Sequence, residues 1–239
     1  MSKASAEPRV VVALDYPQAE QALAFADQVT PSLCRVKVGK ELFTRAGPAI
    51  VQALAERGFD VFLDLKFHDI PNTVAAAVRA AADLGVWMLN VHALGGPRML
   101  QAASEARQSA GRELLLIGVT VLTSMDTEQL KAVGLQAPPA ALVAQLAALS
   151  AEHGMDGVVC SAQEVEVLRG NLPDAFVYVT PGIRPAGMQA GDQRRIVTPR
   201  EAAQAGASYL VVGRPVTQAD DPCQALLTIN AEIADIRTA

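Results

Sequence analysis

The sequence predicts a (β/α)8 barrel, the TIM-barrel fold, formed by a single domain over residues 1–239 with a polar tail at residues 1–8. Three observations support this fold. Eight short runs rich in β-branched residues recur along the chain, and several are apolar at nearly every position, as strands covered on both faces are. Amphipathic segments with helical spacing separate these runs. The length of 239 residues suits one such barrel.

The predicted strands, in chain order, span residues 10–15, 35–39, 61–67, 87–93, 114–122, 157–160, 176–180 and 209–213. Three predicted helices are each followed by a glycine that stops them: 43–57 before Gly58, 73–84 before Gly85 and 139–153 before Gly154. A doubly wound open sheet would call for a glycine-rich turn after the first strand, where this chain has Leu14-Asp15-Tyr16-Pro17. The barrel is therefore the favoured architecture.

Composition narrows the class of protein. Half of the residues (51%) are apolar, yet no apolar run reaches the ~18 residues of a membrane-spanning helix, and residues 1–9 lack the apolar core of a secretory signal. The cysteines Cys34, Cys160 and Cys223 are odd in number and widely spaced, which predicts thiols in a reducing, cytoplasmic environment. A formal charge of -5 argues against nucleic-acid binding but allows a local basic pocket for a phosphorylated small molecule.

Charged residues stand at the ends of three predicted strands. Asp64 and Lys66 are two apart on one strand, so they share a face, and their apolar neighbours take the face toward the helices. Lys37 is bracketed in the same way, Asp15 ends the first strand, and Asp69 follows in a loop. Because barrel active sites lie at the carboxyl ends of the strands, we expect these charges to converge on the barrel mouth.

Such an alternating array can perform a specific kind of chemistry. Carboxylate neighbours favour the charged form of each lysine, and a cation beside a reacting carbon stabilises a developing carbanion and then protonates it. A carboxylate beside a substrate carboxylate destabilises the bound ground state until carbon dioxide leaves. The array requires no electron sink, and the sequence has no obvious site for pyridoxal or thiamin cofactors. These side chains therefore have the chemistry that a decarboxylation requires.

A phosphate site is expected after the last two strands, where barrels commonly bind phosphate. Gly213 allows close backbone approach and Arg214 offers a bidentate donor, although Gly-Arg-Pro alone is also a common turn. The long loop after the seventh strand contributes Arg184. Arg194 and Arg195 stay open between phosphate contacts and solvated charges at a helix start.

The segment Asp64-x-Lys66-x-x-Asp69-Ile70-Pro71-x-Thr73 resembles the signature of the orotidine 5'-phosphate decarboxylase family. The resemblance covers nearly the whole chain, in the length and motif order of the shorter bacterial form. The other matching motifs lie at strand ends and are Ala13-Leu14-Asp15, Lys37-Val38-Gly39, Val119-Thr120-Val121-Leu122-Thr123-Ser124, Thr180-Pro181-Gly182-Ile183-Arg184 and Val212-Gly213-Arg214. It implies decarboxylation of orotidine 5'-monophosphate to uridine 5'-monophosphate in de novo pyrimidine biosynthesis, with no metal or cofactor.

The resemblance also implies a role for each catalytic residue. Lys66 would donate the proton to C6 of the pyrimidine, and Asp64 would lie against the scissile carboxylate. Lys37 and Asp69 would complete the array, with Lys37 also touching the ribose. Asp15 would bind a ribose hydroxyl.

Other implied residues bind substrate or reach across a homodimer. Asp69, Ile70 and Thr73 would enter the partner subunit's site. The remaining implied substrate-binding residues, around the pyrimidine and the phosphate, are Thr123, Pro181, Arg184, Gln193, Gly213 and Arg214.

Three alternative functions are less favoured. Magnesium-dependent sugar-phosphate decarboxylases and hexulose-phosphate synthases share an Asp-x-Lys-x-x-Asp segment but carry a glutamate ligand where this chain has Lys37, and a lysine repels a cation. A Schiff base at Lys66 needs a neutral amine, which Asp64 and Asp69 disfavour. A barrel that binds nucleotide without catalysis is unsupported, because the charged array is complete. His68 is given no role, and Asn90 with His92 is interpreted as hydrogen-bonding within the barrel.

Overall fold

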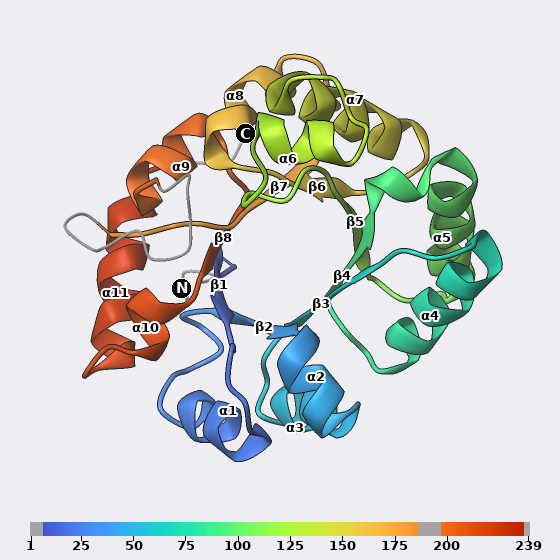
Figure 1. Cartoon of the computed structure of the whole chain (residues 1–239). Coiled ribbons are helices and arrows are strands. Elements are labelled where there is room, and N and C mark those ends of the chain that lie inside the picture. The colour runs from blue at the N-terminus through green and yellow to red at the C-terminus, as the bar shows by residue number, and fades with distance from the viewer. Residues whose placement is uncertain (1–6, 186–196, 237–239) are drawn as a thin grey trace.

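The computed structural model describes residues 7–185 and 197–236, and its centre is a closed barrel of parallel strands in sequence order (Figure 1). The strands are β1 (Val10–Ala13), β2 (Arg35–Gly39), β3 (Val61–Phe67), β4 (Met88–His92), β5 (Leu115–Val119), β6 (Gly157–Val159), β7 (Val177–Thr180) and β8 (Tyr209–Val212). Pairing of β8 with β1 closes the ring. The predicted TIM barrel is confirmed.

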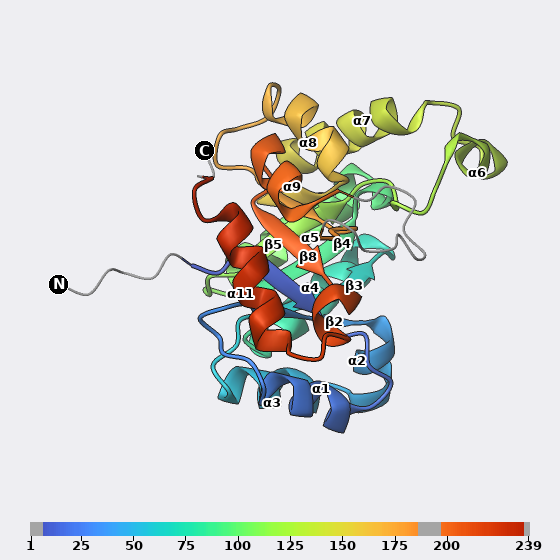
Figure 2. The ribbon, with the colours of Figure 1, turned by 90° about the vertical axis from the view of Figure 1, so that its left-hand side faces the viewer.

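Helices surround the barrel and cover its outer face (Figure 1). They are α1 (Ala19–Ala26), α2 (Lys40–Ala46), α3 (Ala49–Glu56), α4 (Pro71–Asp83), α5 (Pro97–Ser109), α6 (Thr127–Ala132), α7 (Pro139–Glu152), α8 (Ala162–Arg169), α9 (Pro199–Ala205), α10 (Arg214–Thr217) and α11 (Pro222–Ile233), with a 3-10 turn at Ala93–Gly95. In Figure 2, α6 projects away from the barrel. No helix within the described ranges combines the length and apolarity needed to cross a membrane.

Side-chain alternation divides the core into two layers. Along β1, Val10 and Val12 pack outward against the helices, while Val11 and Ala13 point into the barrel. Inside the barrel, a smaller apolar cluster also contains Phe62 from β3. The charged residues at the strand ends therefore lie above a layer of apolar side chains inside the barrel.

The predicted helix at residues 43–57 is wrong as a single element. The chain forms α2 and α3 instead, separated by Gly47 and Pro48. Gly47 has a φ of 64°, and the residue before a proline is disfavoured in the α region, so the helix stops there. The predicted strands at 10–15 and 114–122 also continue past β1 and β5, because the ladder stops where the chain turns into the loops of the barrel mouth.

The amino-terminal end of the barrel is closed by one buried cation. The side chain of Arg35, only 4% exposed, forms ion pairs of 2.8 Å with Glu7 and 2.9 Å with Asp60. Its guanidinium lies 4.2 Å from the ring centroid of Trp87 and 5.4 Å from that of Tyr209. Two aromatic rings and two carboxylates stabilise the positive charge of the guanidinium, so Arg35 fills this end of the barrel.

Candidate active site

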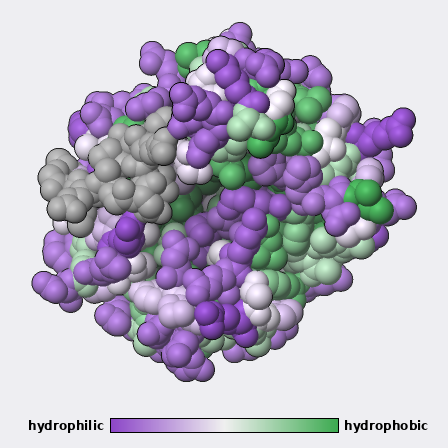
Figure 3. Space-filling view, viewed as in Figure 1, coloured by the Kyte–Doolittle hydropathy of each residue, from purple (hydrophilic) through white to green (hydrophobic). Residues whose placement is uncertain are grey.

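A cavity of about 670 Å³ opens at the carboxyl ends of the strands. In the space-filling view, hydrophilic residues surround a hollow on this face (Figure 3). Its walls carry side chains from the ends of several strands, as expected for the mouth of a TIM barrel. The cavity is the candidate active site.

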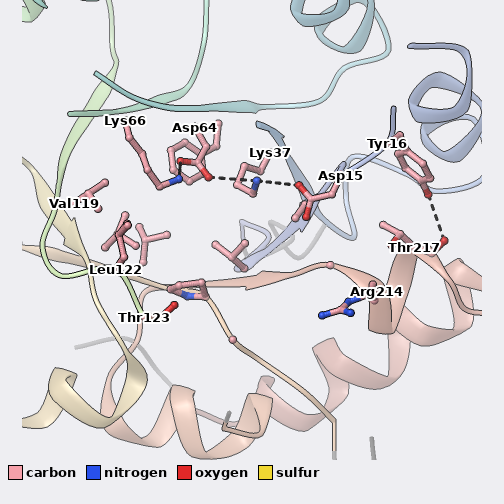
Figure 4. Close-up of a pocket in the computed structure, with 18 of the residues that line it drawn as sticks. Asp15, Tyr16, Lys37, Asp64, Lys66, Val119, Leu122, Thr123, Arg214 and Thr217 are labelled. Atoms are coloured by element: carbon pink, nitrogen blue, oxygen red, sulfur yellow. Dashed lines mark hydrogen bonds and ion pairs between the residues drawn. The ribbon is translucent and has the colours of Figure 1, made fainter. Parts of the chain in front are cut away.

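Four charged side chains form an alternating row along one wall of the cavity (Figure 4). The Lys66 Nζ lies 2.5 Å from Asp64 Oδ1, and the Lys37 Nζ lies 3.3 Å from Asp64 Oδ2. On its other side, the Lys37 Nζ lies 3.4 Å from Asp15 Oδ1. A Cβ at Gly39 would lie 3.2 Å from the Lys37 Nζ, so glycine leaves room for this ammonium. The expected convergence of charged side chains from the ends of β1, β2 and β3 is therefore present.

Asp64 is the central anion of the row, and its side chain is 12% exposed. Burial by itself raises the pKa of this carboxyl, but the ammonium groups of Lys37 and Lys66 and hydrogen bonds from Lys66 and Asn90 outweigh burial. The net result is a pKa below the ordinary value for an aspartate. Asp64 is therefore a carboxylate at neutral pH.

Strand β3 is irregular where it carries the array. Its register against β4 shifts between Leu63 and Phe67, and Lys66 has a φ of 53°. Regular alternation was expected to aim Asp64 and Lys66 the same way. The two side chains do meet, but through a bulge with a left-handed residue, and bulges of this kind redirect side chains next to active sites.

Asn90, from β4, joins the array and is completely buried. Its Oδ1 accepts a hydrogen bond from the Lys66 backbone N–H at 2.8 Å, and its Nδ2 donates to Asp64 Oδ1 at 2.7 Å. The expectation of a hydrogen-bonding residue within the barrel is confirmed for Asn90. Nothing in the sequence indicated that its partners would be Asp64 and Lys66; a polar residue at a strand end was the available signal.

The residues expected to serve a partner subunit lie outside this cavity. Asp69, Ile70 and Thr73 are exposed around the start of α4, and none lines the cavity. The Asp69 Oδ1 accepts a hydrogen bond from the Ile70 N–H at 2.6 Å. Within one chain the row thus ends on Asp15 beyond Lys37, and the contribution of Asp69 to an array stays a prediction.

The expected phosphate residues line the cavity next to the carboxyl ends of β7 and β8. Gly213 follows β8 directly, Arg214 opens α10, and both line the cavity with Pro181 and Arg184. Arg184 is buried, and its Nη1 donates to the carbonyl oxygen of Ile183 at 2.8 Å. The predicted residues Gln193, Arg194 and Arg195 lie outside the described residues.

Two further residues, Thr123 and Tyr16, line the cavity. Thr123, predicted to contact the pyrimidine or its covering loop, lines the cavity. Tyr16 was not singled out from the sequence; it lines the cavity and its hydroxyl donates to the carbonyl oxygen of Thr217 at 3.3 Å (Figure 4). Its position directly after Asp15 at the end of β1 was the only sequence signal.

Comparison with known proteins identifies the family. A model of the Orotidine 5'-phosphate decarboxylase / HUMPS family matches residues 8–229. The chain belongs to this family. It is 58% identical over 228 residues to orotidine 5'-phosphate decarboxylase of Nitrosococcus oceani, covering 95% of this chain and 98% of the relative. It is 59% identical over 226 residues to the protein of that name from Chromohalobacter salexigens, covering 95% and 96%.

Solved structures agree with the barrel. Orotidine 5'-phosphate decarboxylase from Lactobacillus acidophilus superposes with a TM-score of 0.85 at 40% identity, covering 95% of this chain and 99% of that one. The enzyme of the same name from Pyrococcus horikoshii OT3 superposes with a TM-score of 0.77 at 26% identity, covering 95% and 100%. The family resemblance seen in the sequence is confirmed.

Two histidines of the family barrel lie beside the array and were not assigned to it. The rings of His68 and His92 stack with centroids 5.3 Å apart. Burial, together with repulsion from His68, Lys66 and Lys40, lowers the pKa of His92 to about 4. The His92 Nδ1 accepts a hydrogen bond from the Leu94 N–H at 3.4 Å, which fits a neutral ring.

Proposed function

We propose that this chain decarboxylates orotidine 5'-monophosphate to uridine 5'-monophosphate and carbon dioxide, as a step of pyrimidine biosynthesis. The observation that carries the proposal is the alternating row of Lys66, Asp64, Lys37 and Asp15 along the cavity wall. The relatives that cover nearly the whole chain at 56% to 59% identity, all named orotidine 5'-phosphate decarboxylase, support it.

The substrate would span the cavity from the array to α10. Its phosphate would bind the backbone of Gly213 with the guanidinium groups of Arg214 and Arg184, because arginine matches phosphate with paired donors. Gln193, outside the described residues, would join them. The ribose would contact Asp15 and Lys37. The remaining lining residues proposed here to border the pyrimidine are Asp64, Lys66, Thr123 and Pro181.

Bond cleavage would follow from the charges around C6. The substrate carboxylate would lie against Asp64, whose low pKa keeps it negative, so the bound ground state is destabilised by repulsion. The bond from C6 to the carboxylate carbon breaks, carbon dioxide leaves, and the electron pair stays on C6. The Lys66 ammonium stabilises this pair and then donates its proton to C6. Water returns a proton to the lysine.

A second copy of the chain would complete the array. Ile70 is a large apolar side chain that is 67% exposed, and it stands beside the exposed Asp69 and Thr73. Burial of this corner against a partner would cover the apolar surface and bring Asp69 near the partner's lysines. We therefore infer a homodimer with sites at its interface.

The same inference extends to organisation and location. The strands and covering helices run from Val10 to Ile233 around one barrel, which supports a single domain. None of the three cysteines forms a disulfide, which supports a reducing, cytoplasmic compartment.

A divalent cation does not suit this donor set. The two oxygens of Asp64 already face the ammonium groups of Lys66 and Lys37, and both cations would repel a metal. Within the described ranges, no cluster of three or more His, Cys, Asp or Glu side chains could hold a metal ion. The magnesium-dependent sugar-phosphate enzymes are therefore the less favoured alternative.

The test is direct. Purified protein is mixed with orotidine 5'-monophosphate and excess chelator, and the pyrimidine absorbance is followed. Turnover without added metal is expected. No turnover, or turnover that appears only with magnesium, would overturn the proposal.

A further inference from the structure

The pairing of β3 with β4 leaves a gap at the array. Leu63 is opposite Leu89, and Phe67 is opposite Val91, so four steps along β3 match two steps along β4. Three residues of β3, which include Asp64 and Lys66, therefore face a single residue of β4. Extra residues in a bulge lose their ladder partners, and a buried backbone N–H without a partner is costly.

Asn90 is the single β4 residue opposite this bulge. Its side-chain oxygen replaces the missing ladder acceptor by taking the Lys66 N–H at 2.8 Å, and its amide nitrogen donates to Asp64 Oδ1 at 2.7 Å. The same Asp64 oxygen lies 2.5 Å from the Lys66 Nζ. One planar amide thus fixes the backbone of Lys66 and the carboxylate that Lys66 faces.

The backbone conformation of Lys66 requires stabilising contacts of this kind. Its φ of 53° places a residue with a Cβ in the left-handed region, which is strained and persists only where surrounding contacts fix it. Lys66 is the only residue other than glycine with a positive φ among the residues the structure describes. Return to a regular strand would turn its side chain away from its present direction.

We propose that Asn90 is a positioning residue for the decarboxylation: its amide holds the bulge of β3 so that Lys66 and Asp64 meet at the reacting carbon. This proposal rests on the proposed function for its catalytic consequence. The alternative is a buried polar residue that contributes to folding only. The two differ in what Asn90 substitutions do to turnover, to product binding and to the geometry of Lys66.

The first variant is Asn90→Leu, which keeps a similar volume and removes both hydrogen bonds. We expect kcat to fall roughly 10- to 100-fold, as for hydrogen bonds to a charged group. The dissociation constant of uridine 5'-monophosphate should change by less than about threefold, because Asn90 is not among the residues that line the cavity. Ser150→Ala is the matched control: Ser150 is also completely buried and donates to the Leu146 carbonyl at 2.8 Å, outside the cavity. It should leave kcat unchanged.

The second variant is Asn90→Asp, read from the pH profile of kcat/KM. It keeps an acceptor for the Lys66 N–H and replaces the donor to Asp64 with a second carboxylate. The groups that face Asp64 are Lys37 from β2 and Lys66 from β3, while Asp15 and His92 act on these lysines. The acid limb should move to higher pH, since two adjacent carboxylates resist joint ionisation. An unmoved acid limb would mean that residue 90 does not face Asp64 in the active enzyme.

The outcomes are separable. If the parent chain turns over substrate and folded Asn90→Leu keeps kcat within about twofold, as Ser150→Ala does, the positioning role is overturned. If Asn90→Leu does not fold, an unmoved acid limb in Asn90→Asp overturns it. If the parent chain itself is inactive, the proposed function fails, and a crystal structure of an Asn90 variant then tests the positioning role. An unchanged Lys66 backbone and an unchanged Lys66–Asp64 contact would refute that role. Loss of both would support it.

Discussion

The two ends of the barrel each bury a cation from the same strand, and they differ in what surrounds it. Arg35 and Lys37 are two residues apart on β2, so both point toward the barrel axis. Arg35 meets two aromatic faces and two carboxylates that reach solvent, and it fills its end. Lys37 faces the buried Asp64 beside a cavity of about 670 Å³. The cation that is enclosed by aromatic rings and carboxylates closes the barrel, whereas the cation that borders a cavity can reach a substrate.

The largest expected effect is at the open end. Lys66→Ala removes the proposed proton donor and should lower kcat/KM by roughly 10²- to 10⁴-fold, measured from the pyrimidine absorbance. The free energy of unfolding should fall, because the variant removes one of the two cations that compensate the buried Asp64 carboxylate. Retention of more than a tenth of the activity would contradict the role of Lys66.

Arg214→Ala tests the far end of the same cavity. We expect a roughly 10- to 100-fold loss in kcat/KM, with part of it in kcat, because phosphate binding supports distortion and closure at the reacting carbon. Steady-state kinetics at saturating substrate separate the two effects. An unchanged kcat would limit Arg214 to ground-state binding.

Arg35→Met tests the closed end. The stacked and paired guanidinium is lost, so the free energy of unfolding should fall by about 2 kcal/mol, measured by chemical denaturation. The kcat of the folded variant should match that of the parent chain. A large loss of kcat would show that the two ends of the barrel are coupled.

Near neutral pH, the smallest effect is expected at His92, which acts on stability only as the pH falls. Burial, followed by repulsion from neighbouring positive charges, lowers the pKa of His92 from 6.5 to about 4. Between these values the unfolded chain binds a proton at this residue and the folded chain does not, so this term makes stability fall as the pH falls from 6.5 to about 4. His92→Asn should give a flatter melting temperature across this window. An identical slope in both proteins would contradict the shift at His92.

Local sequence patterns predicted many of the residues of the candidate site. Alternation along β2 and β3 predicted that Lys37, Asp64 and Lys66 point to the barrel mouth, although the structure brings Asp64 and Lys66 together through a bulge. Glycine and arginine after β8 indicated the phosphate end. The partner-facing residues Asp69, Ile70 and Thr73 came from family resemblance, because a contact between chains leaves no periodicity in one chain. The continuous helix across Gly47-Pro48 was wrong because apolar spacing outweighed the breaker signal in the prediction.

The barrel and the identities of the charges at its mouth follow from the sequence alone, because a period of two on strands and helical spacing between them are local properties. How those charges are held depends on the folded barrel. The bulge at Lys66, its φ of 53° and the amide of Asn90 depend on the register between β3 and β4. Register is fixed by packing between segments distant in sequence, so no window of the sequence contains it.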